Sequence, residues 1–197
     1  MSAISIGRKK GGRAATRVLL LMLCLLGLVL IARGTIIPVK AQVAQILLER
    51  AFDESRGAGR PMRPWPWADT APVSRISIAR LGVKRIILSG GSGQAMAFGP
   101  TELPIDRDAR VTVMAAHRDT HFAFLADAKP GDVVTVEPVA GVVRRYRITG
   151  FQTVRWDAFA FSRNPVRPLL ALVTCYPFGA TTQGPMRFVV WAEEIRL

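Results

Sequence analysis

The feature that most constrains the fold is a series of short β-type segments, separated by turn residues, that begins near Val73. VSRISIARL and VKRIIL are divided by Gly82, and GDVVTVEPV and VRRYRITGF alternate around Gly141 as the arms of a hairpin do. GGSGQAMAFGP predicts a turn, a short helix and another turn.

Three further segments complete the series. VTVMAA and LLALVTCY are continuous apolar runs, which predicts strands buried on both faces, and RFVVWAEEI is the last strand. About seven or eight short strands in roughly 125 residues, without any long helical period, predict an all-β domain over residues 73–197 that closes, or nearly closes, into a barrel.

The N-terminal part of the chain has a different character. Residues 18–32 are uncharged and almost wholly apolar, and basic residues precede them. A helix over this run covers about 22 Å of a hydrocarbon core of about 30 Å, and extension to Val39 covers the remainder. We therefore predict a cytoplasmic N-terminus over 1–17 and a single transmembrane signal anchor over 18–39, with the rest on the periplasmic side of the inner membrane. A cleaved signal peptide ending near Val39-Lys40-Ala41 is the alternative.

Between anchor and barrel, residues 40–72 predict a stalk helix and a linker. AQVAQILLERAF has helical spacing, and the Gly- and Pro-rich segment after it disfavours regular structure. The formal charge of +13 suits anionic lipids or cell-wall polymers. Nucleic acid is not expected as a partner, because the basic residues are scattered through strand-like segments and form no recognition-helix pattern.

The two cysteines, Cys24 and Cys175, cannot pair, because one lies in the apolar run and the other follows a folded domain. Cys175 is therefore a lone thiol in an oxidising compartment. It is either a buried structural cysteine or a reactive one. Its place at the end of an apolar strand, before Tyr176-Pro177, allows its side chain to face a cleft.

Arg187 begins the next strand, so antiparallel pairing would make it a neighbour of Cys175, able to support developing oxyanion charge. His117 also follows a buried strand, and a histidine near a thiol can act as a general acid or base. Taken alone, Arg187 could equally be a solvent-exposed charge. His121 competes with His117, but we expect a structural role for it. A metal site built on the two histidines lacks a third ligand at a suitable spacing.

These residues resemble the sortase family of cysteine transpeptidases. The resemblance is carried by Leu172–Cys175, by Gly184–Val190 and by Ala116–Phe122, which is similar to the family's Gly-His-Arg-Asp-Thr segment with Ala116 in place of the usual glycine. The order His, Cys, Arg also agrees. Trp65–Thr70 resembles a stretch found in the Gram-negative branch called the marine proteobacterial class.

The resemblance implies an eight-stranded sortase β-barrel with short helices, preceded by the membrane anchor. It implies that Cys175 is the nucleophile and that His117 is the general acid and then the general base. Arg187 would position the substrate and support the oxyanion, and Thr174 would help to shape the oxyanion hole. No cofactor or metal is implied. The substrate would be a protein with a C-terminal sorting signal similar to Leu-Pro-x-Thr-Gly, and the amine that accepts the acyl group is not identified.

Two other functions compete with this interpretation. An L,D-transpeptidase shares the compartment and a Cys–His pair, but its histidine and cysteine lie close together in a Ser-His-Gly-Cys type motif, which is missing from this sequence. A catalytically inactive, membrane-tethered barrel that binds a partner is the second alternative.

Overall fold

The computed structural model describes residues 10–105, 109–162, 164–182 and 184–195, without the side chains of residues 10–14, 32 and 35–38. The chain forms two compact units, Met1–Val43 and Ala44–Leu197. Helix α1 spans Lys10–Ala58, so its first part belongs to one unit and its last turns belong to the other.

The first unit is the N-terminal part of α1. Its large apolar side chains between Val18 and Ile31 are exposed. The predicted anchor over residues 18–39 falls within this helix, but among the residues that the structure describes no helix is both long enough and apolar enough to cross a membrane.

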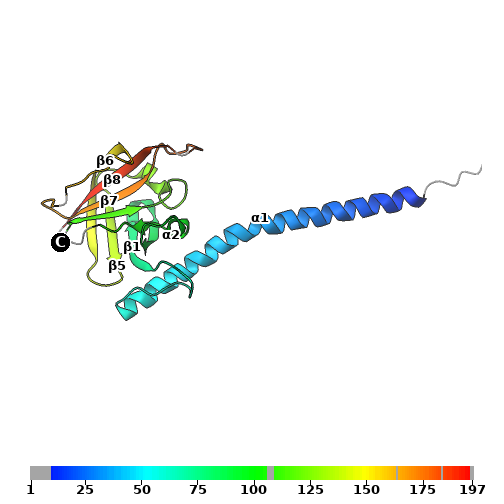
Figure 1. The fold of residues 1–197 in the computed structure, drawn as a ribbon, viewed down its shortest axis with the longest axis horizontal. Helices are drawn as coiled ribbons and strands as arrows, with labels where there is room; N and C mark the ends of the chain where they lie inside the picture. The colour runs from blue at the N-terminus through cyan, green and yellow to red at the C-terminus, as the bar shows by residue number, and fades with distance from the viewer. Residues whose placement is uncertain (1–9, 106–108, 163, 183, 196–197) are drawn as a thin grey trace, which may run out of the picture. The chain divides into compact units, whose positions relative to one another are not determined.

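The second unit contains a closed barrel of eight strands in the order β1-β2-β3-β4-β7-β8-β6-β5 (Figure 1). This confirms the predicted eight-stranded barrel. Short helices connect some of its strands: α2 (Gly93–Phe98) and the 3-10 helices η1 (Ala79–Leu81) and η2 (Ala123–Asp127). The strands are β1 (Pro72–Ile78), β2 (Val83–Ser89), β3 (Thr101–Glu102), β4 (Val111–Ala115), β5 (Val133–Pro138), β6 (Arg144–Arg155), β7 (Leu169–Cys175) and β8 (Met186–Glu194).

Alternation along the strands produces the core of the barrel. In β1 every second side chain is buried, and in β6 the buried side chains are Tyr146 and Ile148. Since successive side chains of a strand point to opposite faces, one face of each strand fills the interior. The main cluster includes Ile76, Ile78, Ile87, Met114, Phe122, Val134, Leu170, Leu172 and Val190.

The last turns of α1 pack on the barrel. Leu48 and Phe52 are fully buried and form a cluster with apolar side chains of β2 and with Val139. Residues 44–72, within the predicted stalk helix and linker over residues 40–72, belong to the same compact unit as the strands. The buried apolar face of the helix accounts for this association.

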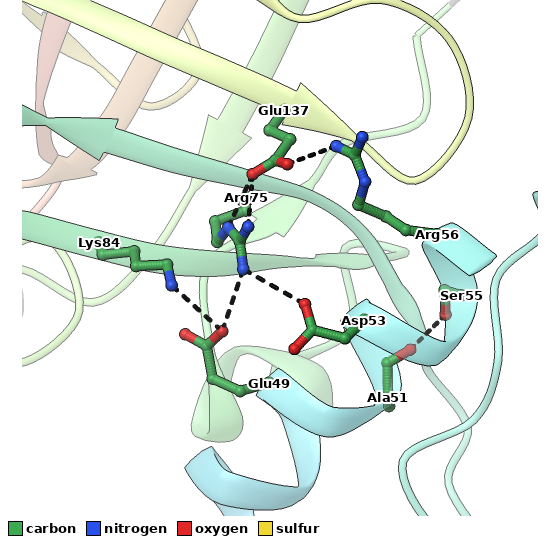
Figure 2. Close-up of polar contacts among 8 residues, drawn as sticks. All are labelled: Glu49, Ala51, Asp53, Ser55, Arg56, Arg75, Lys84 and Glu137. Atoms are coloured by element: carbon green, nitrogen blue, oxygen red, sulfur yellow. Dashed lines mark hydrogen bonds and ion pairs between the residues drawn. The ribbon is translucent and has the colours of Figure 1, made fainter.

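Charged side chains of the last turns of α1 form ion pairs with charged side chains of β1, β2 and β5 (Figure 2). The guanidinium of Arg75 lies 4.5 Å from the ring centroid of Phe52 and donates two hydrogen bonds to Glu137, at 2.6 and 2.9 Å. It also lies 3.4 Å from Glu49 and 3.6 Å from Asp53, both on α1. Because Arg75 is largely buried, these contacts offset the loss of its hydration and hold the helix end against β1 and β5.

Candidate active site

Cys175 and Arg187 are direct neighbours. Strands β7 and β8 pair antiparallel, and their register sets Cys175 opposite Arg187. The pairing continues one step further, where the backbone N–H of Tyr176 donates to the carbonyl of Met186 at 3.0 Å. The side chains of Cys175 and Arg187 are both half-buried. The predicted proximity of the two residues is confirmed.

A second strand pairing places His117. Strands β4 and β7 run parallel with Ala115 opposite Val173, and the N–H of Ala116 donates to the carbonyl of Val173 at 3.2 Å. His117 therefore follows β4 by the same two residues by which Cys175 follows Val173. Since parallel strands advance together, His117 and Cys175 reach the same end of the barrel.

The alternation of side chains places Cys175 and Arg187 on one face of the sheet. Leu172 and Val190 point into the barrel core. Cys175 and Arg187 have the opposite parity in β7 and β8, so they belong to the outer face, and His117 lies two residues beyond the end of β4. Of the three, His117 is the exposed one.

That outer face has an apolar surface. Its buried floor consists of side chains from β4, β7 and β8, and partly exposed side chains from β6 and from the loop between β6 and β7 pack against the floor. At the end away from Cys175, a hollow of about 450 Å³ is lined in part by Gly150, Leu169 and Trp191. The buried members include Val113, Ala171 and Val189, and the partly exposed members include Val154, Phe159, Phe161 and Val173.

The Arg187 guanidinium has N–H donors that no other described residue accepts. Its Nη1 donates to the carbonyls of Gly184 and Met186 at 3.0 and 2.9 Å, and both acceptors belong to its own segment. A guanidinium has five N–H donors in a planar fork. The donors on Nε and Nη2 make no hydrogen bond to another described residue, so they can serve a ligand on the outer face.

Thr174 lies on the opposite face from Cys175 and is buried. Its hydroxyl donates to the carbonyl of Ala116 at 2.8 Å. This contact joins the residue before Cys175 to the residue before His117. The Thr174 hydroxyl therefore already has a protein acceptor. Its hydrogen bond contacts the backbone of the histidine segment at the residue before His117.

His121 is half-buried beside α2 and β2. Burial lowers its pKa, and the nearby charges of Arg85 and His117 lower it further, against a backbone contact with Ala97 that raises it. A neutral imidazole that is partly removed from solvent suits the structural role predicted for His121. No group of three or more His, Cys, Asp or Glu residues within the described ranges is arranged to hold a metal ion.

Sequence reasoning missed Arg118. Its side chain is buried, and it contacts Asp119 and the carbonyls of Ala180 and Thr182 in the loop between β7 and β8. A signal for it was present, because Arg118 directly follows His117 within the Ala116–Phe122 segment that resembles a family motif. The acceptors lie more than sixty positions away and become visible only in the fold.

Comparisons with known proteins agree with this architecture. The family model of the sortase domain matches residues 76–195. Sortase A from Corynebacterium diphtheriae, a lid mutant, has a TM-score of 0.56 at 20% identity, over 79% of this chain and 95% of that chain. The pilus-related sortase C of Group B Streptococcus has a TM-score of 0.54 at 24% identity, over 64% of this chain and 68% of that chain.

Sortase C from Clostridium perfringens SM101 has a TM-score of 0.53 at 19% identity, over 80% of this chain and 90% of that chain. At these identities the structural likeness supports the fold. No curated protein matches the chain. The family model covers more than half of the residues, with strands β1 to β8 in or overlapping the matched range. The chain therefore belongs to the sortase family.

Proposed function

We propose that this protein is a cysteine transpeptidase that cleaves a C-terminal sorting signal similar to Leu-Pro-x-Thr-Gly and transfers the acyl group to an amine or to water. The observation that supports the proposal is the strand register, in which Cys175 pairs with Arg187, and Ala115 pairs with Val173 two residues before His117 and Cys175. Membership of the sortase family supports the same reaction class.

In the first half of the reaction, Cys175 attacks the substrate carbonyl as a thiolate. The tetrahedral intermediate collapses with cleavage of the C–N bond, and His117 as imidazolium gives its proton to the leaving amine. The product is a thioester between Cys175 and the substrate's new C-terminal acyl group. In this scheme the free donors of Arg187 bind the oxygen on which negative charge develops.

In the second half, an amine attacks the thioester and His117 accepts its proton. A new amide bond forms, and the sulfur leaves as thiolate. Attack by water instead gives hydrolysis. Thr174 is a positioning residue in this scheme, because its hydroxyl fixes the carbonyl of Ala116 beside His117. Alignment of the reacting groups supplies much of the rate gain of such a reaction.

The apolar outer face is the proposed binding surface for the sorting signal. Six residue steps along β7 separate Cys175 from Leu169, which corresponds to about 20 Å. A five-residue motif in extended conformation spans about 17 Å. The length and apolar character of the surface therefore suit residues upstream of the scissile bond, with the acceptor amine entering from the exposed side of His117.

The location of the protein forms a separate part of the proposal. Sortases are generally extracytoplasmic, and we place the barrel on that side of the cytoplasmic membrane. Attachment through residues 18–39 is supported by the exposed apolar side chains between Val18 and Ile31 and by the basic residues before them. Fractionation of cells before and after deletion of residues 1–39 tests the attachment. Assignment to the marine proteobacterial class rests on Trp65–Thr70 alone.

The chemistry is tested by incubating the purified protein with a peptide that carries the sorting motif and weighing the intact protein by mass spectrometry. The expected product is a thioester adduct that hydroxylamine releases. Cys175→Ala should form no adduct, whereas Cys24→Ser, which alters the other cysteine, should form it normally. An adduct that persists in Cys175→Ala would refute the assignment of the nucleophile.

A thiol probe distinguishes the enzyme from an inactive binding barrel. Cys175 is half-buried rather than fully enclosed, so the native protein should react with iodoacetamide at this residue. A Cys175 that reacts only after unfolding would favour the inactive barrel.

A further inference from the structure

Arg118 places a buried charge directly after His117. The residue is 6% exposed. Its Nε donates to the carboxylate of Asp119 at 3.1 Å, and its Nη2 donates to the carbonyl of Ala180 and, at 3.1 Å, to that of Thr182. Burial of a guanidinium is unfavourable unless its donors are paired, so these contacts hold the side chain in one geometry.

The two carbonyls belong to the loop that connects Cys175 to Arg187. One guanidinium therefore ties the histidine segment to the segment between the two other residues of the site. On the other side of His117, the hydroxyl of Thr174 donates to Ala116 at 2.8 Å. His117 is consequently flanked by two buried polar contacts, and each of them joins its backbone to the chain around Cys175.

We propose that Arg118 is a positioning residue of the active site, which sets the imidazole of His117 against the Cys175 sulfur by locking the His117 segment to the loop between β7 and β8. This inference rests on the proposed function for its catalytic meaning. Its geometric content, the mutual placement of the imidazole and the sulfur, is independent of any substrate.

The chemistry of the side chain supports a positioning role. A planar fork can bridge a carboxylate and two carbonyls in a fixed arrangement, which a single ammonium group cannot reproduce. Nη1 of Arg118 is buried and has no hydrogen-bond partner among the described residues, so burial of this side chain carries a desolvation penalty in the free energy of folding. An error of about 1 Å in the placement of a catalytic group can lower a rate by about 10²-fold.

The test uses full-length protein with Cys24→Ser, so that Cys175 is the single thiol. Arg118→Met removes the three hydrogen bonds while keeping an unbranched side chain, and Arg118→Lys keeps the charge without the fork. The matched control is Arg110→Met. The Arg110 guanidinium also donates to two loop carbonyls, those of Pro165 and Val166 at 3.2 and 3.1 Å, but it is exposed and lies away from His117.

A cooperative thermal unfolding transition first shows that each variant is folded, and two measurements are then made on it. The first is the rate of iodoacetamide alkylation of Cys175 between pH 5 and pH 10. Besides Cys175 and His117, the charged or titratable groups that bear on this profile are Asp119, His121, Arg187 and Arg118 itself. The second is kcat and KM for thioester formation with the sorting peptide.

For Arg118→Met we expect the pH profile of Cys175 alkylation to differ from that of the parent protein, because the imidazole no longer keeps its place relative to the sulfur. We expect kcat to fall by about 10²-fold with little change in KM. Arg118→Lys should change in the same direction by a smaller amount, and Arg110→Met should match the parent protein in both measurements.

The inference is overturned if folded Arg118 variants keep the parent's alkylation profile and kcat. If Arg118→Met does not fold, Arg118→Lys decides by the same two criteria. A parent protein that forms no thioester would refute the proposed function, whereas the comparison of alkylation profiles would still decide whether Arg118 positions the two groups.

Discussion

Replacement of Thr174 by valine tests whether one hydroxyl holds the histidine segment in place. Valine has nearly the same shape as threonine, so the packing in the barrel is kept. The substitution removes the donor to the Ala116 carbonyl, 2.8 Å from the Thr174 hydroxyl, and both residues are buried. The carbonyl then loses its partner without gaining water, which is the costly way to lose a hydrogen bond.

The expected cost follows from that geometry. An unpaired buried acceptor costs about 1–3 kcal/mol, so we take about 2 kcal/mol for Thr174→Val. For a unit of the size of Ala44–Leu197, each kcal/mol corresponds to roughly 2–4 °C in Tm. Thr174→Val should therefore melt about 4–8 °C below the wild type. Because Ala116 precedes His117, the rate of thioester formation should fall by about tenfold or more.

Calorimetry and thioester formation at saturating peptide measure the two effects. Thr174→Ser keeps the hydroxyl and should retain most of the stability and of the rate. The matched control is Thr112→Val on β4, where a half-buried threonine makes no hydrogen bond to another described residue, and its Tm should change little. A Thr174→Val protein with the Tm and the rate of the wild type would refute the reasoning.

Three further predictions concern stability. Phe52→Ala empties a fully buried site beneath Arg75 and should cost about 3–5 kcal/mol in urea unfolding; a cost below about 1 kcal/mol would mean that the helix end contributes little to the barrel. Hydrogen bonds from Arg80 hold the pKa of Asp132 below its usual value. The carboxylate therefore stabilises the fold above its unfolded pKa of about 3.9. This contribution is lost as the pH falls through the lowered folded pKa. Asp132→Asn should be less stable at pH 7, and its deficit should shrink below about pH 4; a deficit independent of pH would contradict the ion pair. Burial lowers the pKa of His121, so the stability that its neutral imidazole contributes above about pH 6.5 is lost as the pH falls through the lowered folded pKa. His121→Gln should therefore lose less stability than the wild type between pH 7 and pH 5. Equal losses in the two proteins would contradict the lowered pKa of His121.

The strands were predictable where their pattern is local. The alternation in residues 72–78 and the apolar run in residues 169–175 appear in the sequence at the positions where β1 and β7 form. Strand β3 was missed, because two residues are too short to show any period. Strand β6 continues to Arg155, beyond the predicted hairpin arm, because pairing with β8 orders a segment whose own pattern is weak.

The site was predictable in part for the same reason. Cys175 and Arg187 lie on strands that follow each other, so antiparallel pairing was enough to expect them to be neighbours. The position of His117 at the same end of the barrel as Cys175 depends on the parallel pairing of β4 with β7, which lie far apart in the chain. No local pattern specifies which distant strand becomes a neighbour.

The sequence by itself determined most of the strand segments, the turn positions and a lone thiol at a strand end, because side-chain periodicity and turn chemistry are properties of a few adjacent residues. The tertiary structure alone decided the order of the strands in the closed barrel, the packing of the last turns of α1 on it and the burial of Arg118 against the loop of Ala180 and Thr182. These features depend on closure of the sheet into a barrel. Closure pairs the backbone hydrogen-bonding groups of every strand edge, so the neighbours of each strand are set by the whole barrel and not by any single segment.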